Sequence, residues 1–188
     1  MRSDAGNLAA FLFGLKQRHA PYYRRIVEAI RQVAPFFDDF VLIPKPETGQ
    51  RSILLNWKDR DSEHLFGPHQ LSDGTLRAMA LITLLLQPED QLPELIVLDE
   101  PEIGMHPYAI EVRASLIRGA SAHGPLIVAT HSVSLVNYFE PDDIVVVNRS
   151  DGHSHFERQN SQSLAAWLKE YDIGELWEKN LIGGTPSR

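Results

Sequence analysis

The stretch that decides the fold is Leu95–His106, with the sequence LIVLDEPEIGMH. Its first four residues are apolar and run directly into the acids Asp99 and Glu100, and a proline lies on either side of the run. A short apolar run of this kind is typical of a strand that is buried on both faces of a parallel sheet. Ligands of open α/β sheets bind beyond the carboxyl ends of the strands, so the pattern places both acids at the ligand edge. The simpler interpretation is that the acids only end a strand and begin a turn.

A second strand end follows after one helix. We expect this helix from Pro107 to about Arg118, and a strand over Pro125–Ala129 that leads into the polar residues 130–132. A strand, a helix and a strand in succession form a right-handed crossover in which the two strands are parallel. Both strand ends then share one edge, which brings His131 near Asp99 and Glu100. A lone histidine is usually a satisfied polar residue, but beside two carboxylates it is a candidate to contact phosphate or water.

A third motif lies upstream, where residues 71–75 read LSDGT. Ser72 is a good N-cap for an almost wholly apolar helix that ends before Pro88. Gly74 lets backbone N–H groups approach a ligand, and the N-terminus of a helix attracts anions. A plain N-cap followed by a tight turn explains the same residues equally well.

The rest of the chain predicts ordinary packing elements. We expect helices over 7–18, 21–33, 161–171 and 174–177, and strands over 39–43, 51–57, 143–148 and 153–158, with a turn at 48–50. Five basic side chains on the first two helices either contact phosphates or line solvated helix faces; they are Lys16, Arg18, Arg24, Arg25 and Arg31. His153 and His155 alternate along one strand but lack a third metal ligand nearby.

Composition narrows the class of protein. The 188 residues suffice for one domain with a real core. The net charge is −7, but residues 1–60 hold 10 Lys and Arg against 6 Asp and Glu, which permits a basic patch there. The absence of cysteine excludes disulfides and thiolate metal sites and agrees with a cytoplasmic protein. No apolar run approaches the roughly 20 residues of a membrane helix, so we expect no membrane partner.

The ordered motifs LSDGT, LIVLDEPEIGMHP and ATHS resemble the C-terminal half of an ATP-binding-cassette-type ATPase, of the cytoplasmic RecF/SMC-like, AAA-type kind. The resemblance extends from about Asn7 to Gly184. It implies an α/β, three-layer P-loop NTPase-like fold with a mostly parallel central sheet flanked by helices. It also implies a single domain with a helical and β-hairpin part (1–66), a core with the signature, Walker B and switch-histidine motifs (67–148), and a closing part (149–188).

The resemblance also implies ATP and Mg²⁺ as cofactors and gives a role to each motif. The signature, which contacts the γ-phosphate of ATP held by a second protomer, comprises Ser72, Asp73, Gly74 and Thr75. Asp99 is the Walker B acid that holds Mg²⁺, Glu100 the base that activates water, and His131 the switch histidine. The loop that crosses the dimer interface includes Glu102, Gly104 and His106. Phosphoryl transfer needs positioning and charge neutralisation, which such groups supply.

Two departures from the family pattern stand out. The signature has Asp73 where LSGGQ has a glycine and Thr75 where it has glutamine. The second is the phosphate-cradling motif GxxxxGK[ST], which is absent because none of the 12 glycines is followed by lysine. We therefore expect the chain to be the C-terminal part of a longer ATPase, truncated at the N-terminus. It should be inactive alone, bind ATP weakly and carry an unpaired sheet edge.

The expected partner is a Walker A-bearing lobe or a second protomer, in a homodimer or within a longer ATPase. DNA or a nuclease as a further partner is implied only by the resemblance to this family. Two other functions remain open. One is a non-catalytic regulatory or assembly module that retains the ATPase fold. The other is a metal-dependent hydrolase that uses the acids of the Walker B stretch with His106 and His131; it leaves the LSDGT motif unexplained.

Overall fold

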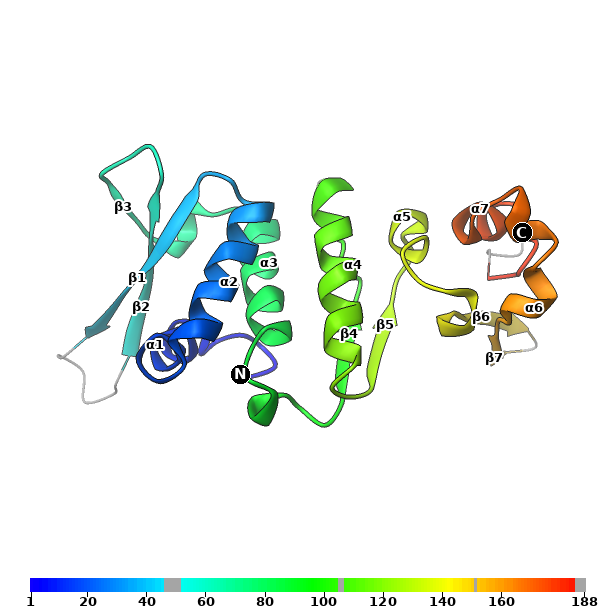
Figure 1. Cartoon of the computed structure of the whole chain (residues 1–188), viewed down its shortest axis with the longest axis horizontal. Coiled ribbons are helices and arrows are strands. Elements are labelled where there is room, and N and C mark those ends of the chain that lie inside the picture. The colour runs from blue at the N-terminus through cyan, green and yellow to red at the C-terminus, as the bar shows by residue number, and fades with distance from the viewer. Residues whose placement is uncertain (46–51, 105–106, 151, 185–188) are drawn as a thin grey trace.

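The structure is a computed structural model that describes residues 1–45, 52–104, 107–150 and 152–184 (Figure 1). Its helices are α1 (Leu8–Arg18), α2 (Ala20–Val33), α3 (Asp73–Leu85), α4 (Pro107–Ser121), α5 (Val133–Val136), α6 (Ser161–Leu164) and α7 (Ile173–Glu178). Its strands are β1 (Phe37–Lys45), β2 (Ser52–Asp59), β3 (Leu65–Phe66), β4 (Ile96–Asp99), β5 (Leu126–Ala129), β6 (Val145–Ser150) and β7 (His153–Arg158). Short 3₁₀ turns are η1 (Pro68–Gln70), η2 (Glu89–Gln91), η3 (Pro141–Asp143) and η4 (Trp167–Lys169).

The N-terminal part packs α1 and α2 against an antiparallel sheet of order β1-β2-β3. The apolar stripes that predicted the two helices are the buried faces, and Leu12, Ile26 and Ile30 are fully buried. Phe37 and Phe40 of β1 pack with them, and the centroids of their two rings lie 4.7 Å apart in an edge-to-face arrangement. Each of these buried side chains contributes about 1.5–3 kcal/mol, so this cluster fixes the sheet to the helices. The predicted turn at 48–50 lies outside the described residues.

Helix α3 lies between α2 and α4 and connects two hydrophobic clusters (Figure 1). Met79 and Ile82 belong to the cluster with α1 and α2, whereas Leu81 and Leu85 pack with β4 and α4. Burial on these two sides accounts for the almost wholly apolar sequence of this helix. Because the helix is held on two sides, its N-terminal end has a fixed place near the turn that follows β4.

Strands β4 and β5 pair in parallel, in register from Ile96 opposite Leu126 to Asp99 opposite Ala129. Helix α4 connects them, so the predicted unit of two parallel strands joined by a helix is confirmed. The expectation that the first strand is buried on both faces is wrong. Ile96 and Leu98 are buried in the cluster with α3 and α4, but Val97 is 63% exposed. Ile127, opposite Val97, is 56% exposed, because no described element covers this face of the pair.

The C-terminal part consists of the antiparallel hairpin β6–β7 and the short helices α6 and α7. Val146, Leu164, Ile173 and Leu176 form its buried cluster. The expected helix over 161–171 is interrupted; it divides into α6 and the turn η4. In Figure 1 the parts follow one another along the long axis, with the β1–β3 sheet at one end and β6–β7 at the other.

The α/β class is confirmed, but the sheets differ from the expected central sheet. The described strands form three small sheets of three, two and two strands, of which only β4–β5 is parallel. The described residues thus do not form a mostly parallel central sheet.

A separate expectation concerned membranes. Across the described residues, no helix combines the length and the apolar character needed to cross a membrane.

Candidate functional site

The two predicted strand ends meet as expected. Asp99 is opposite Ala129 at the end of the parallel pair, and the backbone N–H of Glu100 donates to the Ala129 carbonyl at 2.8 Å. Glu100 then has a φ of +43°, a left-handed conformation that is uncommon for a residue with a side chain. Its carbonyl accepts from the Ile103 N–H at 3.2 Å, which starts a tight turn. Strain of this kind often marks functional positions.

The turn at residues 101–104 is tied to the end of β5. The Thr130 hydroxyl donates to one carboxylate oxygen of Glu102, and the Ser132 N–H donates to the Thr130 hydroxyl oxygen at 2.9 Å. The polar residues after β5 are thereby attached to the turn after β4. Sequence reasoning passed over Thr130, although it lies directly before His131 in the ATHS motif.

The same turn also touches the start of α3. A Cβ atom added to Gly74 would lie 2.7 Å from the Gly104 carbonyl oxygen, closer than real Cβ contacts allow. Gly104 has a φ of +75°, which favours glycine. The structure therefore brings the LSDGT and DEPEIG motifs into backbone contact. Gly74 is needed for this approach, whereas Gly104 is needed for the positive φ of the turn.

The start of α3 is capped as its sequence predicts. The Ser72 hydroxyl oxygen accepts from the Thr75 N–H at 3.1 Å, and the hydroxyls of Ser72 and Thr75 lie 2.8 Å apart. Ser72 and Asp73 are exposed. Capping accounts for Ser72 and Thr75, but it does not require a glycine at position 74. That requirement comes from the neighbouring turn.

A buried cation lies behind the turn and was not predicted. Arg113 of α4 is only 2% exposed, and burial lowers its pKa to about 10, while the nearby charge of Glu102 acts in the opposite direction. Within the described ranges, two guanidinium nitrogens of Arg113 and the second carboxylate oxygen of Glu102 are buried without a hydrogen-bond partner. The signal in the sequence was the position of Arg113 on the apolar face of α4, with Ala109, Ile110, Ala114 and Ile117.

The remaining predicted site residues differ in how far they are exposed and in whether the structure describes them. Asp99 is exposed and Glu100 half-buried at the strand end. His131 is exposed, and its ring makes no hydrogen bond or ion pair with the part of the chain that the structure describes. His106 lies outside the described residues. No three His, Asp or Glu side chains cluster as metal ligands within ranges 1–45, 52–104, 107–150 and 152–184.

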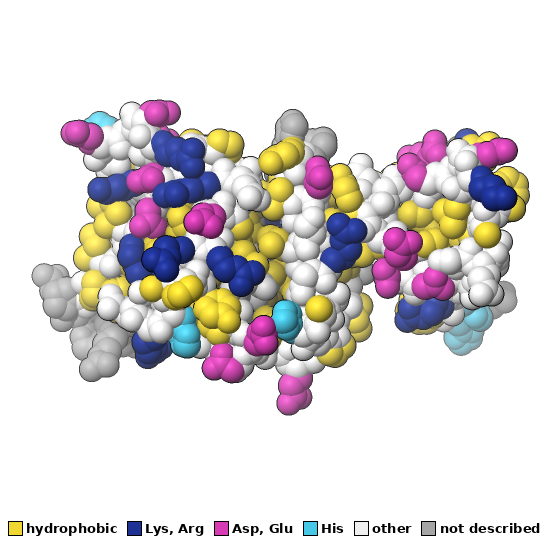
Figure 2. Space-filling view, in the orientation of Figure 1, with side chains coloured by type: hydrophobic (Ala, Val, Ile, Leu, Met, Phe, Trp, Pro, Cys, Tyr) yellow, Lys and Arg dark blue, Asp and Glu magenta, His cyan; other side chains and the backbone are white. Residues whose placement is uncertain are grey.

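Basic side chains gather elsewhere, over the face formed by α1 and α2 (Figure 2). Two of the five that the sequence singled out are neutralised: Lys16 pairs with Asp39 at 3.2 Å and Arg31 with Asp38 at 3.0 Å. Arg18, Arg24 and Arg25 have no acidic partner among the described residues. The charge on this face is therefore smaller than the sequence indicates.

Comparison with known proteins identifies the family. The family described as "AAA domain, putative AbiEii toxin, Type IV TA system" matches residues 8–137, which is most of the chain. The chain belongs to this AAA-domain family. The recognition of a RecF/SMC-like, ATP-binding-cassette-type ATPase from the three motifs is confirmed. No curated protein sequence matches the chain.

Solved structures show the same fold in SMC heads. One, from work on ATP-driven dimerization and DNA-stimulated activation of SMC ATPases, is 16% identical with a TM-score of 0.59, and the match covers 84% of this chain and 94% of that one. An SMC head bound to the C-winged helix domain of ScpA is 18% identical with a TM-score of 0.61, over 77% of this chain and 44% of that one.

A third similar structure is the Smc head domain from Pyrococcus furiosus with an extended coiled coil, bound to the C-terminal domain of ScpA. It is 14% identical with a TM-score of 0.61, and the match covers 82% of the AAA-domain chain and 38% of that protein. The chain thus spans less than half the length of two of these three relatives. At such identities the likeness establishes the fold and leaves the function to the site.

Proposed function

We propose that this AAA-domain chain is the ATP-binding and ATP-hydrolysing module of a RecF/SMC-like ATPase, and that it supplies the signature, Walker B, catalytic glutamate and switch histidine of a composite site. The observation that carries the proposal is the double attachment of the turn at 101–104. The turn contacts Gly74 at the start of α3 and is hydrogen-bonded to Thr130 at the end of β5. The turn therefore connects the LSDGT, DEPEIG and ATHS motifs, which lie far apart in the sequence.

In this proposal each strand-end residue has one task. The exposed carboxylate of Asp99 holds Mg²⁺, which suits an ion that is usually bound by one or two carboxylates together with phosphate oxygens. When bound, Mg²⁺ neutralises charge on the phosphates. Glu100 orients the attacking water and accepts its proton, from a backbone position fixed by its hydrogen bond to Ala129. His131 donates to the γ-phosphate.

The signature residues act on a different nucleotide. Ser72 and Asp73 are exposed at the start of α3, where backbone N–H groups and the helix dipole favour an anion. We propose that Ser72, Gly74 and Thr75 contact the γ-phosphate bound by a second protomer, and that Gly104, Glu102 and His106 lie in the loop at that interface. A homodimer, or two such modules in one assembly, follows from this arrangement. DNA or a nuclease as a further partner rests on kinship alone.

The phosphate cradle must come from another lobe, in the same polypeptide or in trans, since the sequence has no GxxxxGK[ST] motif. The open face of β4–β5 supports this. Val97 and Ile127 lie opposite each other and are both more than half exposed, and Leu95 beside them is 49% exposed. Contiguous apolar side chains of this kind mark interaction surfaces. Covering this face would also produce the three-layer arrangement of a P-loop NTPase.

The test is ATP turnover by the chain combined with the Walker A-bearing lobe of an AAA-domain relative. Turnover should require both parts, and Glu100→Gln should lower kcat by about 10²- to 10⁴-fold while ATP binding persists. Glu94→Gln is the matched control, because Glu94 is exposed and precedes the same strand. Turnover that survives Glu100→Gln would refute the assignment of the base. An assembly that binds no ATP would instead support the non-catalytic module.

A further inference from the structure

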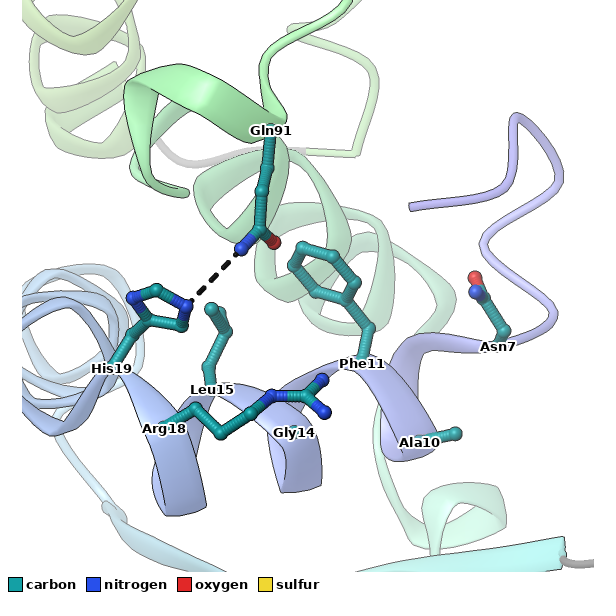
Figure 3. A pocket seen from close by; sticks show the side chains of 8 residues that line it. All are labelled: Asn7, Ala10, Phe11, Gly14, Leu15, Arg18, His19 and Gln91. Carbon is teal, nitrogen blue, oxygen red and sulfur yellow. Dashed lines mark hydrogen bonds between the residues drawn. The ribbon is translucent and has the colours of Figure 1, made fainter.

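A cavity of about 230 Å³ lies between α1 and the 3₁₀ turn η2 (Figure 3). One face of α1 forms most of it, and η2 contributes Gln91 from the connection between α3 and β4. Phe11 gives it most of its apolar wall, because Leu15, which also lines it, belongs to the main core and is only 2% exposed. None of its lining residues is acidic.

The cavity holds a guanidinium that lacks an acidic partner. Arg18 folds back along α1 towards Gly14, as Figure 3 shows, and does not extend away from the helix. A Cβ on Gly14 would lie 3.1 Å from an Arg18 terminal nitrogen, so the glycine makes room for this conformation. No described carboxylate pairs with Arg18. A planar guanidinium in such a place suits a carboxylate or a phosphate, which it binds with two parallel hydrogen bonds.

Other polar groups line the cavity around Arg18. His19 and Gln91 approach each other at 3.4 Å between their side-chain nitrogens, which connects α1 to η2 at one side. Asn7 accepts a hydrogen bond from the Arg2 N–H through its carbonyl oxygen at 2.9 Å, which leaves its amide NH₂ as a donor. Hydrogen-bond donors and one positive charge thus lie beside the apolar surface of Phe11.

From this arrangement we propose that the cavity is a binding site for a small organic oxyanion, a carboxylate or phosphate ester with an apolar body. The hollow of about 230 Å³ is open to solvent and admits a ligand of the size of a benzene derivative. The apolar body of the ligand would pack on Phe11, and its charged group would lie beside Arg18. The proposal is independent of the ATPase assignment, since no residue of this cavity belongs to the strand-end site.

The probes are benzoate, phenyl phosphate, neutral benzamide and inorganic phosphate, titrated into the full chain by ligand-observed NMR. We expect benzoate or phenyl phosphate to saturate with a Kd of about 10 mM or tighter. Benzamide should bind at least about tenfold more weakly, because it has the same shape without the charge. Preference between the two anions then distinguishes a carboxylate from a phosphate source.

Variants locate the site. Arg18→Gln should weaken binding by about tenfold to a hundredfold, the effect of losing hydrogen bonds to a charged group. Gly14→Leu should abolish binding by filling the cavity. The matched control is Arg24→Gln, which removes an arginine that is also exposed but does not line the cavity. Equal losses in the two arginine variants, binding of inorganic phosphate as tight as that of benzoate, or no binding of either organic anion would each overturn the proposal.

Discussion

Gly74→Ala tests the contact that assembles the proposed ATPase site. The new Cβ would lie 2.7 Å from the Gly104 carbonyl oxygen and 3.4 Å from its carbon. Both atoms belong to backbone, so α3 or the turn must move. Overpacking of this kind costs about 1–3 kcal/mol, and the helix preference for alanine over glycine offsets about 1 kcal/mol. We therefore expect a net loss of up to about 2 kcal/mol in the free energy of unfolding.

The assay is urea unfolding of the full chain, with the midpoint compared at constant slope. Gly119→Ala is the matched control, since Gly119 also lies in a helix and a Cβ there meets nothing within 4 Å. That control should gain about 0.5–1 kcal/mol. The two substitutions should thus change stability in opposite directions. Equal stabilisation by both would refute the close approach of Gly104 to Gly74.

Three further perturbations probe the turn after β4 and the contact between α2 and β1. Glu100→Gly should be about 1 kcal/mol more stable to unfolding than Glu100→Ala, because only glycine adopts the φ of +43° without strain; equal stabilities would argue against the left-handed backbone. Glu102→Gln should cost about 1–3 kcal/mol because it leaves Arg113 buried without a nearby carboxylate, and adding Arg113→Met should restore most of the loss in a double-mutant cycle. Burial and then the hydrogen bond to Asp39 raise the pKa of Tyr23 above its ordinary value of 10. The unfolded chain releases this proton above pH 10 while the folded chain keeps it, so stability should fall as the pH rises past 10, and less steeply in Tyr23→Phe.

Periodicity predicted the elements better than their surroundings. The apolar spacing that predicted a helix over 7–18 corresponds to α1, and the run at 125–129 to β5. The apolar run at 95–98 predicts burial on both faces, but it does not show which elements cover each face. In the structure one face is uncovered, and Val97 is exposed. The helix expected over 161–171 divides into α6 and η4, a break that the helical spacing of its apolar residues does not reveal.

In the candidate site, too, some features could be predicted from the sequence and others could not. Crossover geometry correctly predicted that the ends of the two parallel strands meet, because chain direction and connection handedness leave little choice. The contact between Gly74 and Gly104 depends on how α3 packs between α2 and α4, which no local pattern encodes. Arg113 was also missed. In the sequence it is a single cation on an apolar helix face, and its role becomes visible only when the fold places Glu102 nearby.

The most direct test of the central claim is calorimetric titration of ATP with Mg²⁺ into the chain alone and into the chain combined with a Walker A-bearing lobe. We predict heat of binding only when the lobe is present, because the strand-end acids and the signature recognise the metal and the γ-phosphate and no cradle for the other phosphates is encoded here. Tight binding by the chain alone would contradict the composite site, as would the absence of binding in both titrations.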